Sequence, residues 1–395
     1  MRLFNFSKPE TVYHELVSDI GSGSIAISIV RFETGRLPKI IHTERQSFPH
    51  NRVRNAEVLE GNLLKCFKDT LYLVSDYAHK NHIIPRSSSV FYASPWVVSQ
   101  TKTFRLKQEQ KFIFTREIVN KILEKNIDFL SHIDIKSTPF ELASLELVER
   151  KVTRVLVDNT EAQYPFGKKV NSVAVSVFVS AIVRRIHKEI EKDIKHVFVG
   201  SEVQHHSFTL SFFTMVRGIF QYVNDFYLMD IADEVTDLTM VIDSALRDTV
   251  SLPMGRRAMI RRVEQVCGFE TPLAVSALSM YLHGTIRDKS HKKLGPAVKD
   301  LQIDWLTHFN RAVATISKGV GKEDIPKTVF VIADEDILPL FEKALIHNKT
   351  QHSGYKVLVM QPEIFEQLVK EPTGEKKDFF ITLETAYVNS LKMVE

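Results

Sequence analysis

The sequence predicts an α/β protein with more than one domain. Short segments of alternating apolar residues recur between longer segments in which the apolar residues follow helical spacing. A strand–turn–strand pattern occurs twice, at residues 15–30 and again at residues 226–242. Strand-like segments dominate residues 96–180, which indicates a small inserted α+β unit. The chain of 395 residues is long enough for two or three domains with sizeable cores.

The individual elements follow from the same two periodicities. Thr115 is a good N-cap, and the turn at Tyr164-Pro165-Phe166-Gly167 joins two strands of the inserted unit. We expect helices at residues 56–79, 115–125, 186–194, 255–283, 304–317, 338–347 and 383–394. We expect strands at residues 15–30 (two strands), 90–93, 101–106, 111–114, 145–159, 173–181, 197–199, 226–242 (two strands), 328–332 and 379–383.

Composition argues against nucleic acid as a partner. The net charge is only +4, and the basic clusters Arg256-Arg257, Arg261-Arg262 and residues 289–293 around His291 are short, so each is expected on a solvated face or loop. Two widely separated cysteines, Cys66 and Cys267, fit a reducing compartment. Residues 1–6 are too short for a signal peptide, and the apolar run at 173–183 is too short to span a bilayer. These features predict a cytoplasmic protein with peripheral membrane contact at most.

The first candidate site is Asp19-Ile20-Gly21-Ser22-Gly23-Ser24. Glycines without a Cβ let backbone N–H groups crowd around an anion, and the serine hydroxyls add donors. Asp19, at the end of the preceding strand, is placed to hold Mg²⁺ through water. The alternative interpretation is an ordinary β-hairpin turn, which Gly/Ser pairs also favour.

The second candidate site, at residues 229–238, repeats an apolar strand, Asp230-Ile231, a tight turn and a second apolar strand that begins at Thr236-Asp237. Two such hairpins resemble the phosphate loops of the actin, sugar kinase and chaperone ATPase superfamily. The inserted unit makes the resemblance closest to FtsA and PilM. Further similarities are the strands at 151–181 with the loop at 159–167, the "I-P-x-G"-like turn Ser251-Leu252-Pro253-Met254-Gly255, and the adenosine-motif-like strand and helix at 329–345.

This resemblance implies a two-lobed actin-like (ribonuclease H-like) fold with an inserted FtsA/PilM-type α+β subdomain. The implied domains are residues 1–95 and 181–222 for the first lobe, completed by about 350–395, residues 96–180 for the insertion, and residues 223–349 for the second lobe. It also implies ATP with Mg²⁺ as cofactors. The implied nucleotide contacts are Asp19, Gly21, Ser22, Gly23, Ser24, Asp230, Thr236 and Asp237, with Asp19 and Asp230 on the metal.

The departures from the family pattern point to a degenerate nucleotide cleft. Where the family's second loop has three glycines, this sequence has Ala232, Asp233 and Glu234. A carboxylate facing a phosphate at short range costs about 1 to 4 kcal/mol. The adenosine-motif turn reads Ala333-Asp334-Glu335-Asp336, and no charged residue lies between Pro272 and Leu282. No residue stands out as a catalytic base, so we expect a pseudo-ATPase with no catalytic residues.

Three further features have competing interpretations. His205-His206 lies beside Glu202 like a metal site, but adjacent residues point different ways, so a loop pair of histidines is preferred. Residues 383–394 place Leu383, Ala386, Tyr387, Leu391 and Val394 on one helical face, which we expect to dock against the first lobe and not to bind a membrane. Phe104, Phe112 and Phe114 either anchor an assembly surface or fill the core of the insertion, and the core is favoured for at least two of them.

The expected function is an actin-like scaffold of the bacterial cytoskeleton, at the inner face of the membrane. It links a cell-division or type IV pilus assembly to protein partners, either a membrane-associated peptide or a cytoskeletal protein, with self-association through the inserted unit. The alternatives are an ATP-binding actin-like ATPase that polymerises, or a non-polymerising interaction module. Intact glycines in the second loop would favour an enzyme, and Ala232-Asp233-Glu234 does not.

Overall fold

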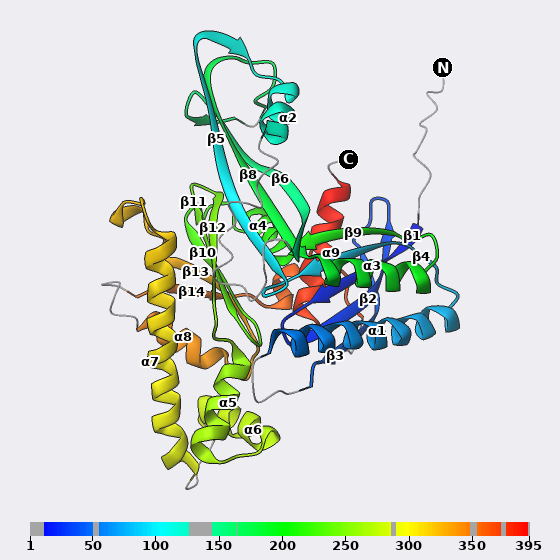
Figure 1. Ribbon diagram of the computed structural model, residues 1–395, viewed down its shortest axis with the longest axis vertical. Helices are drawn as coiled ribbons and strands as arrows, with labels where there is room; N and C mark the ends of the chain where they lie inside the picture. Colours follow the sequence, from blue (N-terminus) through cyan, green and yellow to red (C-terminus); the bar gives the residue numbers. More distant parts are fainter. Residues whose placement is uncertain are drawn as a thin grey trace.

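The computed structural model describes residues 12–49, 55–125, 144–162, 164–285, 290–347, 354–372 and 377–393. Residues 1–6, Val394 and part of the basic cluster at 289–293 are outside the described residues, and so are the expectations made for them. Three sheets organise the described chain, two of five strands and one of four. Figure 1 shows the four-stranded sheet extending from the top of the first five-stranded sheet, with the second five-stranded sheet beside them.

The first five-stranded sheet has a meander followed by parallel strands. Its order is β3-β2-β1-β4-β9, with β1, β2 and β3 antiparallel and with β4 and β9 parallel to β1. The strands are β1 (Val12–Ile20), β2 (Ser24–Glu33), β3 (Lys39–Ser47), β4 (Pro85–Tyr92) and β9 (Glu202–Ser207). Helices α1 (Ala56–Lys80) and α3 (Arg184–Val197) pack on one face of this sheet. We call the sheet together with these two helices the first lobe.

The second five-stranded sheet repeats this topology. Its order is β12-β11-β10-β13-β14, again an antiparallel meander of three strands followed by two parallel ones. The strands are β10 (Phe226–Ile231), β11 (Thr236–Ile242), β12 (Ala245–Leu252), β13 (Thr328–Ala333) and β14 (Lys356–Val359). Its outer face packs against α5 (Arg256–Cys267), α6 (Thr271–Leu282), α7 (Ser290–Ile316) and α8 (Leu338–Ile346), and together they form the second lobe.

Two helices lie between the sheets and join the lobes. One hydrophobic cluster contains residues of α4 (Phe208–Ile219) and α9 (Phe379–Lys392) together with inward-facing residues of both five-stranded sheets. In Figure 1 the red helix α9 runs between the two lobes. Leu383, Ala386 and Tyr387 are buried in this cluster, so the expected docking of the C-terminal helix against the first lobe is confirmed.

The inserted unit is a sheet of order β5-β8-β6-β7 with one helix. It consists of β5 (Val97–Ile113), α2 (Arg116–Lys125), β6 (Leu145–Val157), β7 (Thr160–Glu161) and β8 (Lys169–Val183). Residues 101–106 and 111–114, expected as two strands, belong to the one long strand β5 as far as Ile113. Phe114 is fully buried, and Phe104 and Phe112 pack against the same core, which confirms the core interpretation for these rings.

Two predicted strands are wrong. Residues 197–199 are the end of α3 and the loop after it, and Val199 is 88% exposed. Residues 379–383 are the start of α9, because the Asp378 carboxylate accepts a hydrogen bond from Ile381 N and caps a helix there. Two short 3₁₀ helices, Lys322–Asp324 and Pro362–Phe365, complete the described elements. None of the described helices combines the length and the apolar character that a bilayer-spanning helix needs.

Candidate functional site: two hairpins facing each other

The first hairpin joins β1 to β2 through residues 21–23. Gly21 N donates a hydrogen bond to Ser24 O at 3.0 Å and closes the turn. The indole Nε1 of Trp96 donates to Gly21 O at 2.8 Å and ties the turn to the start of β5. The Gly-Ser-Gly backbone is therefore fixed at one end of the first sheet.

The second hairpin joins β10 to β11 through residues 232–235 and has the same closure. Ala232 N donates to Val235 O at 3.0 Å, as Gly21 N does to Ser24 O. Asp230 and Asp237 face each other across the strands that lead into this turn. None of residues 232–235 has a positive φ angle, so glycine is not needed there to form the turn.

The two turns contact each other directly. Ser22 Oγ accepts a hydrogen bond from Glu234 N at 3.0 Å. The Asp233 carboxylate lies against Gly23, where an added Cβ would be only 1.6 Å from Asp233 Oδ2. The space that a glycine at position 23 leaves open is thus filled by a side chain of the same protein.

Arg257, in the first turn of α5, locks this contact. Its Nε donates to Asp233 Oδ2 at 3.1 Å, and its Nη2 donates to Gly23 O at 3.2 Å and to Phe48 O at 2.8 Å. Its Nη1 donates to Pro49 O at 3.0 Å, and the residue is 5% exposed. The expectation that Arg256-Arg257 lies on a solvated face is therefore wrong for Arg257.

Glu234, the second acidic residue of this turn, also has an arginine partner from α5. Arg261 Nη1 and Nη2 donate to the two Glu234 carboxylate oxygens at 3.0 and 2.9 Å, a bidentate pair. Because Arg257 and Arg261 are four residues apart, they lie on the same face of the helix. Glu234 is 2% exposed, so the solvated-face expectation is also wrong for Arg261.

Asp19, at the end of β1, is held by an arginine of β3, two strands away in the sheet. Arg45 Nη2 donates to Asp19 Oδ2 at 2.7 Å, and Arg45 Nε donates at 2.6 Å to Asp378 Oδ2. Burial raises the pKa of Asp19 to about 6, although Arg45 acts in the opposite direction. Burial also opposes ionisation of Asp378, but Arg45 outweighs it and holds the pKa of Asp378 below its ordinary value.

Glu384 of α9 is the most unusual acidic group near this network. It is completely buried, and neither carboxylate oxygen has a hydrogen-bond partner within the described part of the chain. Burial, reinforced by the negative charge of Asp19, raises the pKa of Glu384 well above its ordinary value. The folded protein therefore favours the protonated form of this carboxyl group.

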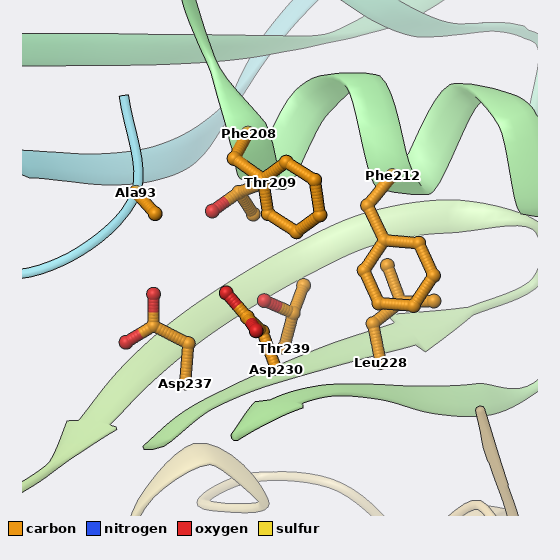
Figure 2. Close-up of a pocket in the computed structure, with 8 residues that line it drawn as sticks. All are labelled: Ala93, Phe208, Thr209, Phe212, Leu228, Asp230, Asp237 and Thr239. Carbon is orange, nitrogen blue, oxygen red and sulfur yellow. The ribbon is translucent and has the colours of Figure 1, made fainter. Parts of the chain in front are cut away.

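Asp230 and Asp237 face a small cavity next to α4. Figure 2 shows their carboxyl groups directed toward Thr209 at the start of α4, with Ala93 beside them. The cavity is about 10 Å³, roughly the space of one water molecule. Asp237 Oδ1 accepts from Ser251 Oγ at 2.6 Å, whereas Asp230 Oδ1 has no hydrogen-bond partner among the described residues.

Burial makes both of these carboxyl groups hard to ionise. It raises the pKa of Asp230 well above its ordinary value, and the negative charges of Asp237 and Asp19 add to the effect. Burial raises the pKa of Asp237 as well, with the hydrogen bond from Ser251 acting against it. The pair therefore tends to hold protons unless a cation is brought in.

A much larger cleft of about 690 Å³ opens beside the two turns. Its volume is within the range of small-molecule sites. Acidic side chains outnumber basic ones on its walls, and the basic ones already pair with carboxylates: Arg45 with Asp378, and Arg256 with Asp336 at 2.6 Å. The ionisable residues that line it are Arg45, Asp233, Arg256, Asp334, Glu335, Asp336, Glu371, Lys377 and Asp378.

Magnesium and a polyphosphate do not fit this arrangement. Arg45 engages Asp19, and the Asp233 carboxylate fills the cradle at Gly23. Asp230 faces a cavity that holds no more than a water molecule or an ion. A polyphosphate would also meet the acidic excess of the cleft. We therefore derive no chemical step through ATP.

The structure brings most of the residues singled out from the sequence to one place. Asp19, residues 21–24, Asp230 and Asp237 all lie at the facing ends of the two sheets. Thr236 Oγ1 instead donates to Met254 O at 2.6 Å and supports the turn from within its own lobe. Whether these residues bind a nucleotide stays a prediction.

Sequence reasoning missed the residues that occupy the site, namely Arg45, Arg257, Arg261, Asp378 and Glu384. One signal was available: two acidic residues stand where glycines are expected, and two arginines follow at helical spacing on the next helix. Arg45 and Asp378 come from distant parts of the chain, and no local pattern connects them.

Comparison with known proteins identifies the fold class. No family model matches the sequence, and no curated protein matches it. A solved structure of the PilM–PilN type IV pilus biogenesis complex matches with a TM-score of 0.60 at 11% sequence identity, covering 98% of this chain and 100% of the other. Weaker similarities include the ethanolamine utilization protein EutJ from Carboxydothermus hydrogenoformans (TM-score 0.43, 10% identity, 96% of this chain and 90% of the other covered) and a Bacteroides thetaiotaomicron protein with an actin-like ATPase fold (TM-score 0.39, 10% identity, 91% and 95% covered).

The chain therefore has the actin-like ATPase fold, with two lobes of the same topology and an inserted four-stranded unit. Within that fold it is similar to PilM along nearly its whole length. The fold class and the PilM-like resemblance predicted from the sequence are confirmed at this level.

Proposed function

We propose that this protein is an actin-like scaffold of the PilM kind, whose nucleotide cleft has been replaced by a contact within the protein. The single observation that carries the proposal is the Asp233 carboxylate, which lies against Gly23 and is held there by Arg257. This contact joins the two lobes at the place where the resemblance puts the phosphates. A scaffold of this kind keeps its lobes together without a nucleotide switch.

The composition of the second loop supports this interpretation. Each acidic residue in it has its own arginine on α5, Arg257 for Asp233 and Arg261 for Glu234. An acidic loop that docks on protein needs a cationic partner for each of its carboxylates, because a buried carboxylate without a partner is strongly destabilising. A phosphate-binding loop needs free backbone N–H groups, and Glu234 N already donates to Ser22.

The proposed partner is a membrane-associated protein that offers a short peptide to the scaffold, in a pilus or other envelope assembly. The similar solved structure is a PilM–PilN complex, which supports a protein partner over a small-molecule substrate. We place the scaffold in the cytoplasm at the inner face of the membrane. A cell-division role of the FtsA type is the other form of the same proposal, with self-association through the edge strand β5 of the inserted unit.

The proposed domains are those that the resemblance implies. The first lobe comprises residues 1–95 and 181–222 and is completed by about residues 350–395. The insertion comprises residues 96–180, and the second lobe comprises residues 223–349. Limited proteolysis tests the boundary near residue 222, where Tyr222 is fully exposed, whereas the chain near residues 95 and 180 is buried and should resist cleavage.

Calorimetric titration of Mg-ATP into the full chain tests the proposal, with Asp19→Ala as the matched variant. We expect no heat of binding and no thermal stabilisation at millimolar ATP for either protein. Micromolar binding that disappears in Asp19→Ala would overturn the self-contact interpretation and favour the alternative, an ATP-binding actin-like ATPase that polymerises. The cleft of about 690 Å³ is the observation that favours this alternative.

Sedimentation separates the remaining forms of the proposal. A scaffold that self-associates will sediment in the absence of lipid. A scaffold that needs a membrane partner will stay in the supernatant when only bare vesicles are present. It pellets when the vesicles carry the partner's cytoplasmic peptide. A chain that remains in the supernatant under all three conditions is a non-polymerising interaction module for a different partner.

A further inference from the structure

Three potential metal ligands converge in the first lobe, on the side of the sheet away from the second lobe. His187 and Glu191 lie on α3, and His205 lies on β9. One ligand atom from each lies within 4.8 Å of the others, and within the described chain this is the one place where three such groups meet. The cluster lies on the α1/α3 side of the sheet, and none of its residues lines either cleft described above.

The local structure explains why these side chains meet. His187 and Glu191 are four residues apart, so they project from the same face of α3. Neighbouring residues of β9 point to opposite faces of the sheet: His206 contacts Glu149 and Tyr387, whereas His205 turns toward α3. The His205-His206 pair lies in a strand and not in the expected loop. Because the two side chains point to opposite faces of the sheet, His205 is directed toward the cluster and His206 is not.

In each of the two histidines, one ring nitrogen contacts a group outside the cluster, and the other ring nitrogen is directed toward the cluster. His187 Nδ1 lies 3.2 Å from Glu146 Oε2, and His187 Nε2 lies 3.9 Å from Glu191 Oε2. His205 Nδ1 lies 3.0 Å from the Tyr92 hydroxyl, and His205 Nε2 is buried and has no hydrogen-bond partner in the part of the chain that the structure describes. A carboxylate or hydroxyl behind each imidazole is the usual surrounding of metal-bound histidine.

Glu191 keeps one carboxylate oxygen, Oε2, for a cation. Lys195 pairs with Glu191 through the other carboxylate oxygen, Oε1, so Oε2 remains directed at His187.

We propose that His187 Nε2, His205 Nε2 and Glu191 Oε2 bind a divalent transition-metal ion, with Zn²⁺ as the best match. Two imidazole nitrogens and one carboxylate oxygen form a donor set that zinc favours, with water completing four-coordination. The ion would tie α3 to β9. It would also fix Glu146 at the start of β6, where the inserted unit joins the lobe. The proposed role is structural: the metal stiffens the root of the insertion.

Zinc titration into the full chain, stripped beforehand with EDTA, tests the site by calorimetry. We expect one equivalent of Zn²⁺ per chain at the cluster and a higher melting temperature in its presence. Glu191→Gln and His205→Ala should each weaken this binding by roughly 10- to 100-fold or more. Co²⁺ in place of zinc should give the intense visible absorption of a four-coordinate site, and Glu191→Gln should remove it.

His196→Ala is the matched control, because His196 is exposed on the same helix and outside the cluster. It should leave the stoichiometry and affinity unchanged. Glu191→Gln keeps the test valid if His205→Ala fails to fold, since Glu191 is partly exposed and the substitution preserves its shape. Absence of stoichiometric binding, or binding that survives in Glu191→Gln, would overturn the proposal and leave only adventitious binding by surface histidines.

Discussion

The two hairpins share a backbone and differ in what their side chains do. Each closes through the same hydrogen bond across four residues, and in each hairpin the strand before the turn also pairs in parallel with another strand of its sheet, β1 with β4 and β10 with β13. The first turn is Gly21-Ser22-Gly23-Ser24, and the second is Ala232-Asp233-Glu234-Val235. Because the second turn forms without glycine, the glycines of the first are not needed for the turn itself.

What the first turn needs glycine for is close approach. At Gly23 the missing Cβ leaves the space that Asp233 now fills, whereas a Cβ at Gly21 would approach only Ser24 O, at 3.2 Å. One turn presents its glycine as the receiving surface, and the other supplies the side chain that enters it. The comparison teaches that a glycine-rich turn can serve as the docking surface for another part of the same protein.

The largest expected effect comes from removing the residue that locks this contact. Arg257→Met removes the hydrogen bonds that its guanidinium donates to Asp233 Oδ2, Gly23 O and Phe48 O. Among the described residues, Gly23 O then keeps only the bond from Phe48 N, and Asp233 keeps only the longer ion pair with Arg256 at 3.7 Å. Breaking one side of a buried ion pair costs about 3 to 5 kcal/mol, which chemical denaturation will measure. Arg262→Met, at an exposed position of the same helix, should change the unfolding free energy by less than about 0.5 kcal/mol. Similar losses in the two variants would contradict the role given to Arg257.

The next effect sharpens the difference between the two glycines. Gly23→Ala puts a Cβ into the Asp233 carboxylate and should cost about 1 to 3 kcal/mol, because Asp233 must move away from Arg257. Gly21→Ala meets only a mild contact and should cost less. Asp233→Gly added to Gly23→Ala should recover the part of the loss that comes from the clash. Equal losses at both glycines would show that backbone freedom, not close approach, is what matters.

The fold was largely predictable, because its elements have strong local periodicities. Both hairpins, the helix over α1 and the inserted strands follow from alternation and helical spacing alone. Failures occurred where tertiary structure overrides local preference. The apolar run at 197–199 reads as a strand, yet the strand is the more polar β9, whose His206 and Ser207 are buried beside β4 and bonded to Glu149.

The residues of the candidate site were predictable only in part. Gly21, Gly23 and the aspartates stand out because their types are unusual at strand ends. Arg257 and Arg261 did not, since two arginine pairs on a helix usually face solvent, and only the fold shows that three of the four meet the acidic turn. The metal-like cluster was missed for the same reason: His187 and Glu191 meet His205 because α3 packs on the sheet that contains β9, which spacing along the chain does not reveal.

A smaller, pH-dependent effect concerns Glu384, whose carboxylate is buried and has no hydrogen-bond partner among the described residues. Its pKa is raised in the folded state by burial, so folding takes up a proton between about pH 4.5 and the higher pKa of the folded state. Stability is therefore lost as pH rises, by up to about 1.4 kcal/mol per pH unit for one group. Burial also raises the pKa of Asp19, to about 6, which adds a loss in the same direction below that pH.

Glu384→Gln removes the Glu384 part of this dependence. We expect the variant to be more stable than the parent at pH 7 by about 1 to 2 kcal/mol, and the advantage should shrink toward pH 5. Urea denaturation at pH 5, 6 and 7 measures this, with the exposed Glu335→Gln as the control. Parallel pH profiles for the parent and Glu384→Gln would show that Glu384 is not protonated in the folded protein.

The smallest expected effect isolates the single direct hydrogen bond between the two turns. Ser22→Ala removes the acceptor of Glu234 N and should cost about 1 kcal/mol. Hydrogen exchange at the Glu234 amide is the sharper measurement, because this amide should lose protection while amides within β10 and β11 keep theirs. Ser24→Ala removes a hydroxyl from the same turn that accepts from Arg45 within the first lobe, so it should leave Glu234 protected. If Glu234 exchanges equally slowly in both variants, the contact between the two turns depends on Asp233 and Arg257 and not on Ser22.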